Sequence, residues 1–307
     1  MNGEFLASMI AIISSQTKEL VDIVNCKGLK PVDKQAQTTM SVSENDTWTP
    51  SNITQAKYYV PYVGATMCPL ESLKKWDCSH CKRLSNITLH AVVQDPKYDT
   101  LVYVTTNNVR RELVISFRGT YSIKNWIQDF NFIHSDFDAV KYARVHTGFK
   151  SCSDGLTPLY LPSVRHILQN PGFADFKLVL TGHSLGGAIA VLSTLNLQKA
   201  LDIPWSRLAV YTYGQPRIGN SFFSNYVNSL PLSMTRVVNE NDLVPHLPPL
   251  PFMYLHQHTE VHINNGVPKI CSTKCAEDPT CSLSRIGNLS FGAHRYAFGI
   301  RIGKGGC

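Results

Sequence analysis

The pattern of apolar and polar positions divides the chain into two parts. In residues 5–24 apolar side chains recur at helical spacing, which predicts an amphipathic helix. Residues 27–54 are rich in Ser, Thr, Asn, Gln and Asp and contain few large apolar side chains, a composition typical of a linker. The pattern therefore predicts an N-terminal segment, 1–57, that is too small and too polar to form its own core, followed by a larger domain, 58–307.

Strand-like and helix-like segments alternate along the larger domain. Short apolar runs predict strands at 86–94, 101–106, 112–117, 177–181, 207–213, 234–239 and 259–263. Helical spacing or a helix-favouring composition predicts helices at 123–130, 157–168, 187–197 and 220–230. Because strands alternate with helices, we predict an α/β fold in which a mostly parallel sheet carries helices on both faces.

The composition is that of a globular chain of enzyme size. Of its 307 residues, 43% are hydrophobic and 17% are charged, which allows a substantial core. The formal net charge is +7, but basic residues adjoin one another only in pairs such as Lys74-Lys75. We interpret the charge as a solvated basic surface, favourable at an anionic lipid interface, and expect no nucleic-acid partner. No apolar run approaches the length of about 18 residues that a membrane span needs.

Glycosylation signals favour a secreted protein. Four Asn-x-Ser/Thr sequons begin at Asn45, Asn52, Asn86 and Asn288. In the oxidising secretory route, most of the nine cysteines are expected to form disulfides. The first residues hold a short apolar run without a basic region before it, so they make a poor signal peptide. We expect that a signal has already been removed or that Met1 is an artificial start.

The strongest candidate for catalysis lies between a predicted strand and a predicted helix. The strand at 177–181 leads into Gly182-His183-Ser184-Leu185-Gly186, a G-x-S-x-G sequence, and the helix at 187–197 follows. A sharp turn at this place exposes the serine hydroxyl, and the helix N-terminus directs N–H groups at negative charge beside it. A glycine-rich turn is the alternative, but the flanking elements favour Ser184 as a nucleophile, with the N–H of Leu185 in the oxyanion hole.

A serine nucleophile needs a histidine base and an orienting carboxylate, which follow this motif in the order acid, then histidine. Asp242 stands out because it lies just past the strand at 234–239, although a turn-capping aspartate is the alternative. The histidines after it are His246, His256, His258, His262 and His294. His246 is too close to Asp242 in sequence. The group at 256, 258 and 262 has strand spacing with a metal site as the rival interpretation, which no acid or cysteine pattern supports. We expect no metal and no cofactor.

Motifs along the chain carry a family resemblance. They are Trp76-Asp-Cys-Ser-His-Cys81, Phe117-Arg-Gly-Thr-Tyr-Ser-Ile-Lys-Asn-Trp126, Thr181-Gly-His-Ser-Leu-Gly-Gly187, Gly214-Gln-Pro-Arg-Ile-Gly219, Asn241-Asp-Leu-Val-Pro-His-Leu-Pro-Pro249 and Ala293-His-Arg-Tyr296. From about Cys68 to Cys307 the chain resembles the class 3 lipase family, most closely its Rhizomucor-type secreted fungal triacylglycerol lipases. The resemblance implies an α/β-hydrolase-like fold and a catalytic triad of Ser184, Asp242 and His294.

The resemblance also implies an oxyanion hole and a lid. The oxyanion hole would use the backbone N–H groups of Thr120 and Leu185. Close relatives have serine at position 120, whose hydroxyl is held by an acid that corresponds to Asp129 here; threonine keeps the hydroxyl and adds a stiff methyl group. The helix at 123–130 resembles the mobile lid that covers the serine in water, although a helix simply packed on the core is the alternative. Its apolar face consists of Ile123, Trp126, Ile127 and Phe130.

The disulfide pairs implied by the resemblance are Cys68–Cys307, Cys78–Cys81 and Cys271–Cys281. Cys26, Cys152 and Cys275 are left over, which departs from the family pattern and leaves the pairing among the three cysteines between 271 and 281 open. A redox role for the Cys-x-x-Cys pair is the alternative, but a thioredoxin-like βαβ context is lacking.

We therefore expect a secreted, glycosylated serine lipase that hydrolyses triacylglycerol esters at an oil–water interface. Residues 1–57 are expected to be an inhibitory pro-segment, as in a zymogen, that covers the apolar groove around the serine. A soluble carboxylesterase on the same fold, such as a feruloyl esterase, is the alternative within the same class. A lipid-binding protein without catalysis is the alternative from another class, and the complete triad argues against it.

Overall fold

A computed structural model describes residues 50–119, 132–257, 259–272, 277–303 and 305–307. Several predictions from the sequence concern residues outside these ranges. They are the amphipathic helix at 5–24, the lid helix at 123–130, Thr120, His258, Cys26, Cys275 and the sequon at Asn45.

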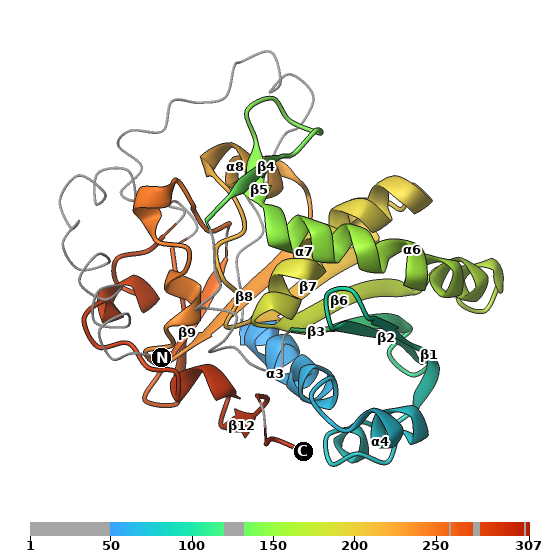
Figure 1. The fold of residues 1–307 in the computed structure, drawn as a ribbon. Helices are drawn as coiled ribbons and strands as arrows, with labels where there is room; N and C mark the ends of the chain where they lie inside the picture. Colours follow the sequence, from blue (N-terminus) through green and yellow to red (C-terminus); the bar gives the residue numbers. More distant parts are fainter. Residues whose placement is uncertain (1–49, 120–131, 258, 273–276, 304) are drawn as a thin grey trace.

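An eight-stranded sheet forms the centre of the described structure (Figure 1). In spatial order its strands are β1 (Ile87–Asp95), β2 (Thr100–Asn107), β3 (Glu112–Arg118), β6 (Lys177–His183), β7 (Leu208–Tyr213), β8 (Ser233–Asn239), β9 (Glu260–Asn264) and β10 (Val267–Ile270). The strands from β3 to β9 run parallel to their neighbours, whereas β1 and β2 at one edge and β10 at the other pair antiparallel. The predicted mostly parallel sheet is confirmed. Strand β10 was not predicted, because it is short and contains Pro268, a residue confined to edge strands.

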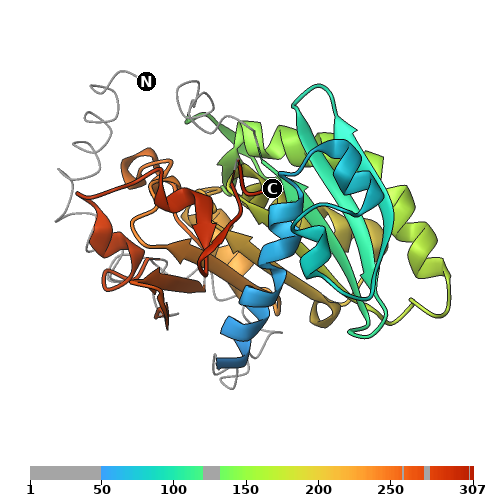
Figure 2. The ribbon, with the colours of Figure 1, turned by 90° about the horizontal axis from the view of Figure 1, so that it is seen from below.

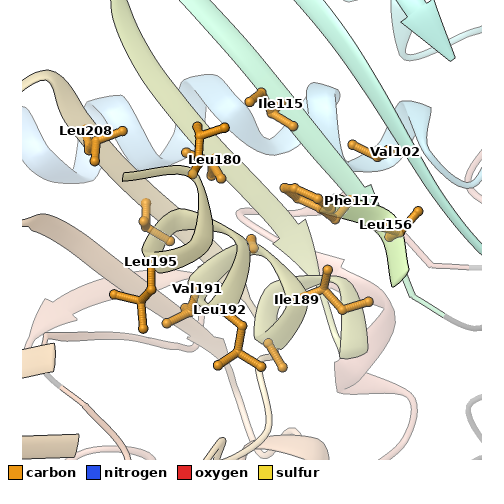
Figure 3. Close-up of a cluster of buried hydrophobic side chains, with 14 of the residues drawn as sticks. Val102, Ile115, Phe117, Leu156, Leu180, Ile189, Val191, Leu192, Leu195 and Leu208 are labelled. Carbon is orange, nitrogen blue, oxygen red and sulfur yellow. The ribbon is translucent and has the colours of Figure 1, made fainter. Parts of the chain in front are cut away.

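Two long helices cover one face of the sheet. They are α6 (Thr147–Gln169) and α7 (Leu185–Leu201), and Figure 3 shows apolar side chains of β3 and β6 directed at α7. The sequence analysis predicted only the second half of α6, because Gly148 and Gly155 lower the helix propensity of the first half. Its apolar residues nevertheless recur at helical spacing and pack on the sheet, so tertiary packing overrides propensity. His146 caps its N-terminus by accepting hydrogen bonds from Gly148 N and Phe149 N.

Helices α3 (Pro50–Ala65) and α4 (Leu70–Lys75) cover the opposite face, which Figure 2 shows from below. The alternation along β3 explains how one strand serves both faces. Ile115 belongs to the core under α6 and α7, whereas the preceding Val114 belongs to the core under α3. Helices on both faces of the sheet are therefore confirmed.

The predicted boundary near residue 57 falls inside α3. The helix begins at Pro50, so the last part of the predicted linker is helical. Ala56 is fully buried and its carbonyl accepts a hydrogen bond from the Tyr213 hydroxyl, while Gln55 accepts one from Arg110 Nη2. Because the residues before Ala56 are mostly polar, the sequence analysis did not predict this helix, which hydrogen bonds attach to the sheet.

The remaining elements are short and lie mostly around the ends of the central strands. They are the strands β4 (His134–Asp136), β5 (Arg144–His146), β11 (Tyr296–Ala297) and β12 (Ile300–Arg301), the helix α8 (Ser221–Ser229), and the single-turn helices η1 (Cys81–Arg83), η2 (Trp205–Arg207), η3 (Val244–His246), η4 (Leu250–Phe252), η5 (Ser282–Arg285) and η6 (Ala293–Arg295). Within the part of the chain that the structure describes, no helix is long and apolar enough to cross a membrane.

Three disulfides link the pairs Cys68–Cys307, Cys78–Cys81 and Cys271–Cys281. These are the pairs that the family resemblance implies. The first joins Cys68, between α3 and α4, to Cys307, across 239 positions of sequence. Cys152, on α6, is a buried free thiol, and burial raises its pKa to about 12. Because the thiolate is the reactive form, this thiol is chemically inert at neutral pH.

Candidate active site

Ser184 lies on a sharp turn between β6, which ends at His183, and α7, which begins at Leu185. Its φ of 58° and ψ of −130° are strained for a residue other than glycine. The backbone N–H of Ser184 donates to Tyr213 O at 2.9 Å, which ties the turn to the end of the neighbouring strand β7. Its hydroxyl has no hydrogen-bond partner among the described residues. Strained backbone of this kind is typical of functional sites.

Two glycines allow the turn because strand and helix approach each other closely there. A Cβ atom at Gly182 would lie 2.2 Å from Gly186 O, and one at Gly186 would lie 2.3 Å from Phe117 O. Both separations are far below van der Waals contact, so any side chain at these positions would push α7 away from the sheet. The G-x-S-x-G pattern thus encodes backbone packing as much as catalysis.

Asp242 and His294 form a buried pair in loops beyond the sheet. His294 Nδ1 lies 2.9 Å from Asp242 Oδ1 and 2.8 Å from Oδ2. The carboxylate also accepts the Val244 N–H at 2.9 Å, so its orientation is fixed. Because a carboxylate only accepts hydrogen bonds, Nδ1 carries the proton and Nε2 is left as a base. That Nε2 is buried and has no partner among the described residues.

Gly214 supports this pair, a role that the sequence analysis did not assign. It directly follows β7, has a φ of 55°, and donates its N–H to Val237 O on β8 at 2.9 Å. A Cβ atom at this position would lie 2.6 Å from Asp242 Oδ2 and 2.8 Å from His294 Nδ1. The side chains of Asp242 and His294 therefore pack directly against the backbone of Gly214. A glycine directly after a predicted central strand was the available signal.

His183 is the second residue near the site that was missed. Its Nε2 donates to the backbone carbonyl of His294 at 2.7 Å, and the two rings lie 4.3 Å apart between centroids. Burial, and then the neighbouring His294, holds the pKa of His183 well below its ordinary value. A neutral imidazole thus links the residue before Ser184 to the loop of His294. In sequence it looked like a variable position of the motif.

Further hydrogen bonds fix the His294 loop to the loop that follows β8. Ser290 N donates to Asn241 O at 2.8 Å, and Leu243 N donates to Ser290 O at 3.3 Å. Asn239, the last residue of β8, donates from its side-chain amide to Ala293 O at 3.1 Å. The loops that carry Asp242 and His294 therefore form one hydrogen-bonded unit, although 52 positions separate the two residues in sequence.

The other histidine candidates lie elsewhere and have structural contacts. His256 Nε2 donates to Pro245 O, and His262 Nε2 donates to Glu240 O, both at 2.8 Å. His246 is buried, and burial, followed by the charges of Arg217 and Arg236, holds its pKa well below its ordinary value. His256 therefore stabilises the loop after Asp242, and His262 stabilises the residue that follows β8.

A buried arginine holds the same loop. Arg217 pairs with Glu277 through Nε and Nη2, at 2.5 and 2.6 Å. Its Nη1 donates to the carbonyls of His246 and Pro248, at 2.6 and 2.9 Å. Two residues of the motif Gly214-Gln-Pro-Arg-Ile-Gly219 therefore have supporting roles. Gly214 supports the Asp242–His294 pair, and Arg217 supports the loop that follows Asp242.

Of the predicted oxyanion groups, only Leu185 is described. It is the first residue of α7, so its N–H belongs to the first helical turn, where donors have no acceptor within the helix. Thr120, Asp129, Ile123, Trp126, Ile127 and Phe130 lie outside the described residues, and their roles stay predictions. The described groups offer a nucleophile, a base with an orienting carboxylate, and a free backbone donor, which together suit acyl transfer.

Comparison with known proteins gives consistent matches. The sequence profile of the family Lipase (class 3) matches residues 114–252. The lipase of Rhizomucor miehei is 35% identical over 261 residues, which cover 83% of this chain and 71% of that protein. A secreted mono- and diacylglycerol lipase 1 of Fusarium solani is 34% identical over 228 residues, covering 72% and 66%. The solved Rhizomucor miehei lipase propeptide complex superposes with a TM-score of 0.78 at 32% identity, covering 83% of each chain.

Proposed function

Because the chain belongs to the class 3 lipase family, we propose that it is a secreted serine lipase that hydrolyses acylglycerol esters at a lipid–water interface. One observation carries this assignment. Ser184 occupies a strained turn at the end of β6, and the Asp242–His294 pair is seated on Gly214 at the end of the neighbouring strand β7. This geometry serves acyl transfer and has no evident purely structural use.

The reaction follows from the chemistry of these groups. The Ser184 hydroxyl attacks the ester carbonyl while His294 Nε2 takes its proton, and Asp242 stabilises the imidazolium that forms. The N–H groups of Leu185 and Thr120 stabilise the negative charge on the tetrahedral intermediate. His294 then gives its proton to the departing glycerol oxygen. Water releases the fatty acid from Ser184 in a second step that uses the same groups.

Residues 123–130 act as a lid in this proposal. In water their apolar side chains would cover the serine, because exposing them forfeits about 25 cal/mol for each Å² of apolar surface. At an oil surface this penalty disappears, and the open state becomes accessible. A hydrogen bond from the Thr120 hydroxyl to Asp129 then orients Thr120 so that its backbone N–H donates to the oxyanion.

The N-terminal residues 1–49 act as a pro-segment that lowers activity. Support comes from α3, which is packed on the sheet, so that the core of the domain is formed by residues from α3 onwards. A similar lipase has been solved as a propeptide complex. The sequons at Asn86 and Asn288 lie on exposed residues, as glycosylation of a secreted protein requires.

Fatty-acid release from an emulsified triglyceride tests the function. The full chain and Ser184→Ala are compared, and the substitution is expected to lower the rate by several orders of magnitude while thermal unfolding stays unchanged. An organophosphonate should form an adduct on Ser184 that mass spectrometry detects. If Ser184→Ala keeps more than about a tenth of the activity, the nucleophile assignment is wrong.

A further inference from the structure

Exposed apolar side chains gather around one group of loops. Nine large apolar residues are exposed in the described parts of the chain, and five of them lie beside β4 and β5, on α8, or at η4. They are Ile133, Tyr142, Phe222, Phe252 and Met253, which we call the apolar rim. The rings of Tyr142 and Phe222 lie 5.7 Å apart, so residues from two separate elements meet at the surface.

The apolar rim stands at the same edge of the sheet as the candidate active site. The hairpin of β4 and β5 is built on the loop after β7, because Asn220 N donates to Arg144 O at 2.9 Å and Gly219 bridges to Val145. This is the loop that begins at Gly214, under the aspartate–histidine pair. Figure 1 shows β4, β5 and α8 grouped together at one end of the molecule. A surface that docked through the rim would therefore face the site.

Two rim residues hold their side chains outward against a backbone preference. Tyr142 has a φ of 65° and Met253 a φ of 64°, a region that large side chains rarely adopt. The two side chains are nevertheless 64% and 68% exposed. Asn220 Nδ2 donates to Tyr142 O at 2.9 Å, and Met253 is the left-handed C-cap of η4, where its N–H donates to Leu250 O. These backbone contacts hold both side chains at the surface, where they are available to a partner.

The charges around the rim select the partner. The hairpin carries two acidic residues, Asp136 and Asp138, and two basic ones, Lys141 and Arg144, so its charge is balanced, and Arg144 is paired with Asp136 at 3.3 Å. A balanced hairpin favours neither nucleic acid nor an acidic protein. Lys141 Nζ lies 4.9 Å from the Tyr142 ring, which leaves the ammonium group at the border of the aromatic surface. Aromatic rings with polar tips and flanking lysines suit the boundary between water and neutral lipid.

We propose that Tyr142, Phe222 and Met253 form a fixed anchor that holds the protein on an uncharged lipid surface, independently of residues 123–130. The inference rests on the proposed lipase function, because it takes the lipid surface as the occupant of the rim. It adds a part of the docking surface that is present before any lid movement. The anchor raises the residence time of the protein at the interface and takes no part in the bond-breaking steps.

Partition of the full chain onto lipid tests the anchor. The Ser184→Ala background prevents hydrolysis, and the lipid is phosphatidylcholine vesicles that contain triacylglycerol. Tyr142→Asn combined with Phe222→Ser is expected to lower the partition coefficient about tenfold. Val109→Asn is the matched control, because Val109 is 73% exposed at the β2–β3 turn, far from the rim, and should partition like the parent.

Thermal unfolding gives a second readout with the opposite sign. Asparagine tolerates a positive φ better than tyrosine or methionine, so Tyr142→Asn and Met253→Asn should keep or raise the melting temperature while they weaken partition. Hydrolysis of a dissolved short ester, measured with Ser184 intact, should stay unchanged in both variants. The ester assay tests the proposed lipase function, because a parent protein that hydrolyses no ester would contradict it. The partition measurement tests the anchor alone.

Four results would overturn the anchor. They are unchanged partition of the Tyr142 and Phe222 double variant, an equal loss in Val109→Asn, binding only to vesicles with anionic lipid, and concentration-dependent dimers that these substitutions abolish. Anionic-only binding would assign docking to the basic surface, and dimers would assign the rim to a second copy of the chain.

Discussion

Gly214→Ala is the sharpest test of how the site is held together. The added Cβ would lie 2.6 Å from Asp242 Oδ2 and 2.8 Å from His294 Nδ1. Unbonded atoms prefer separations of about 3.5 Å, so the pair must move by roughly 0.8 Å to admit the methyl group. A displacement of this size at a catalytic group lowers rates about a hundredfold, which corresponds to about 2.7 kcal/mol of transition-state stabilisation.

Backbone strain is a separate effect and can be measured in a control. Alanine at a positive φ costs about 1–2 kcal/mol, which for a domain of this size lowers the melting temperature by roughly 2–8 °C. Gly299 has a φ of 73°, and a Cβ atom there would meet nothing within 4 Å. Gly299→Ala therefore carries similar strain without the collision.

Kinetics on a dissolved short ester, together with thermal unfolding, separates the two effects. Both variants should lose similar thermal stability, but only Gly214→Ala should lose kcat, with KM nearly unchanged because the substrate groove is not touched. If Gly214→Ala keeps kcat within about threefold of the parent, the pair does not depend on this backbone contact. An equal loss of kcat in Gly299→Ala would mean that general strain, not the collision, explains the effect.

Three further predictions rest on other contacts. His183→Leu removes the N–H donated to the His294 carbonyl and should lower kcat about tenfold and shift the pH profile of kcat/KM. His183→Gln keeps a donor and should retain most activity; equal effects of the two substitutions would exclude the hydrogen bond as the cause. Burial holds the pKa of His183 and of His246 below 6.5, so the unfolded chain binds protons that the folded chain does not. The free energy of unfolding should therefore fall as the pH drops below about 6.5, by about 1.4 kcal/mol per pH unit for each histidine, and a flat series of urea titrations from pH 7.5 to 5 would contradict this. A chain that starts at Pro50 should keep the melting temperature of the full chain and exceed its activity. A chain that starts at Tyr58 loses half of α3, including the carbonyl that accepts a hydrogen bond from the buried Tyr213 hydroxyl, and should melt at least about 5 °C lower. Equal melting temperatures of the two truncated chains would show that the first half of α3 is dispensable.

The central strands were predictable because each is buried on both faces. Such strands read as continuous apolar runs, and those of β3, β6 and β7 stand out from polar surroundings. Helices that depend on tertiary packing were harder to predict. The first half of α6 contains two glycines, and the start of α3 is polar, so neither has a strong local signal.

Only Ser184 could be found from a local signature, whereas Asp242 and His294 were selected by the family resemblance and their supports have no local signature. Ser184 is marked by the flanking glycines, strand and helix. The contact of His183 with His294 joins residues 111 positions apart, and only the folded chain shows it. The same is true of Gly214, whose function depends on which loops close over it. Thr120 and Asp129 rest on family resemblance alone and stay predictions.

The geometry of the candidate site depends on close backbone packing at the ends of three neighbouring strands. Strands β6, β7 and β8 are adjacent and parallel; Ser184 and Gly214 directly follow β6 and β7, and Asp242 lies in the loop that follows β8. The Asp242–His294 pair can approach the end of β7 this closely only because Gly214 has no side chain. Loss of a side-chain hydrogen bond can be compensated by a neighbouring group, but an added atom at Gly214 has no space except the space that the Asp242–His294 pair occupies. Substitutions at the outer strands β1 and β10 should for the same reason affect stability with little effect on kcat, because those strands carry none of these contacts.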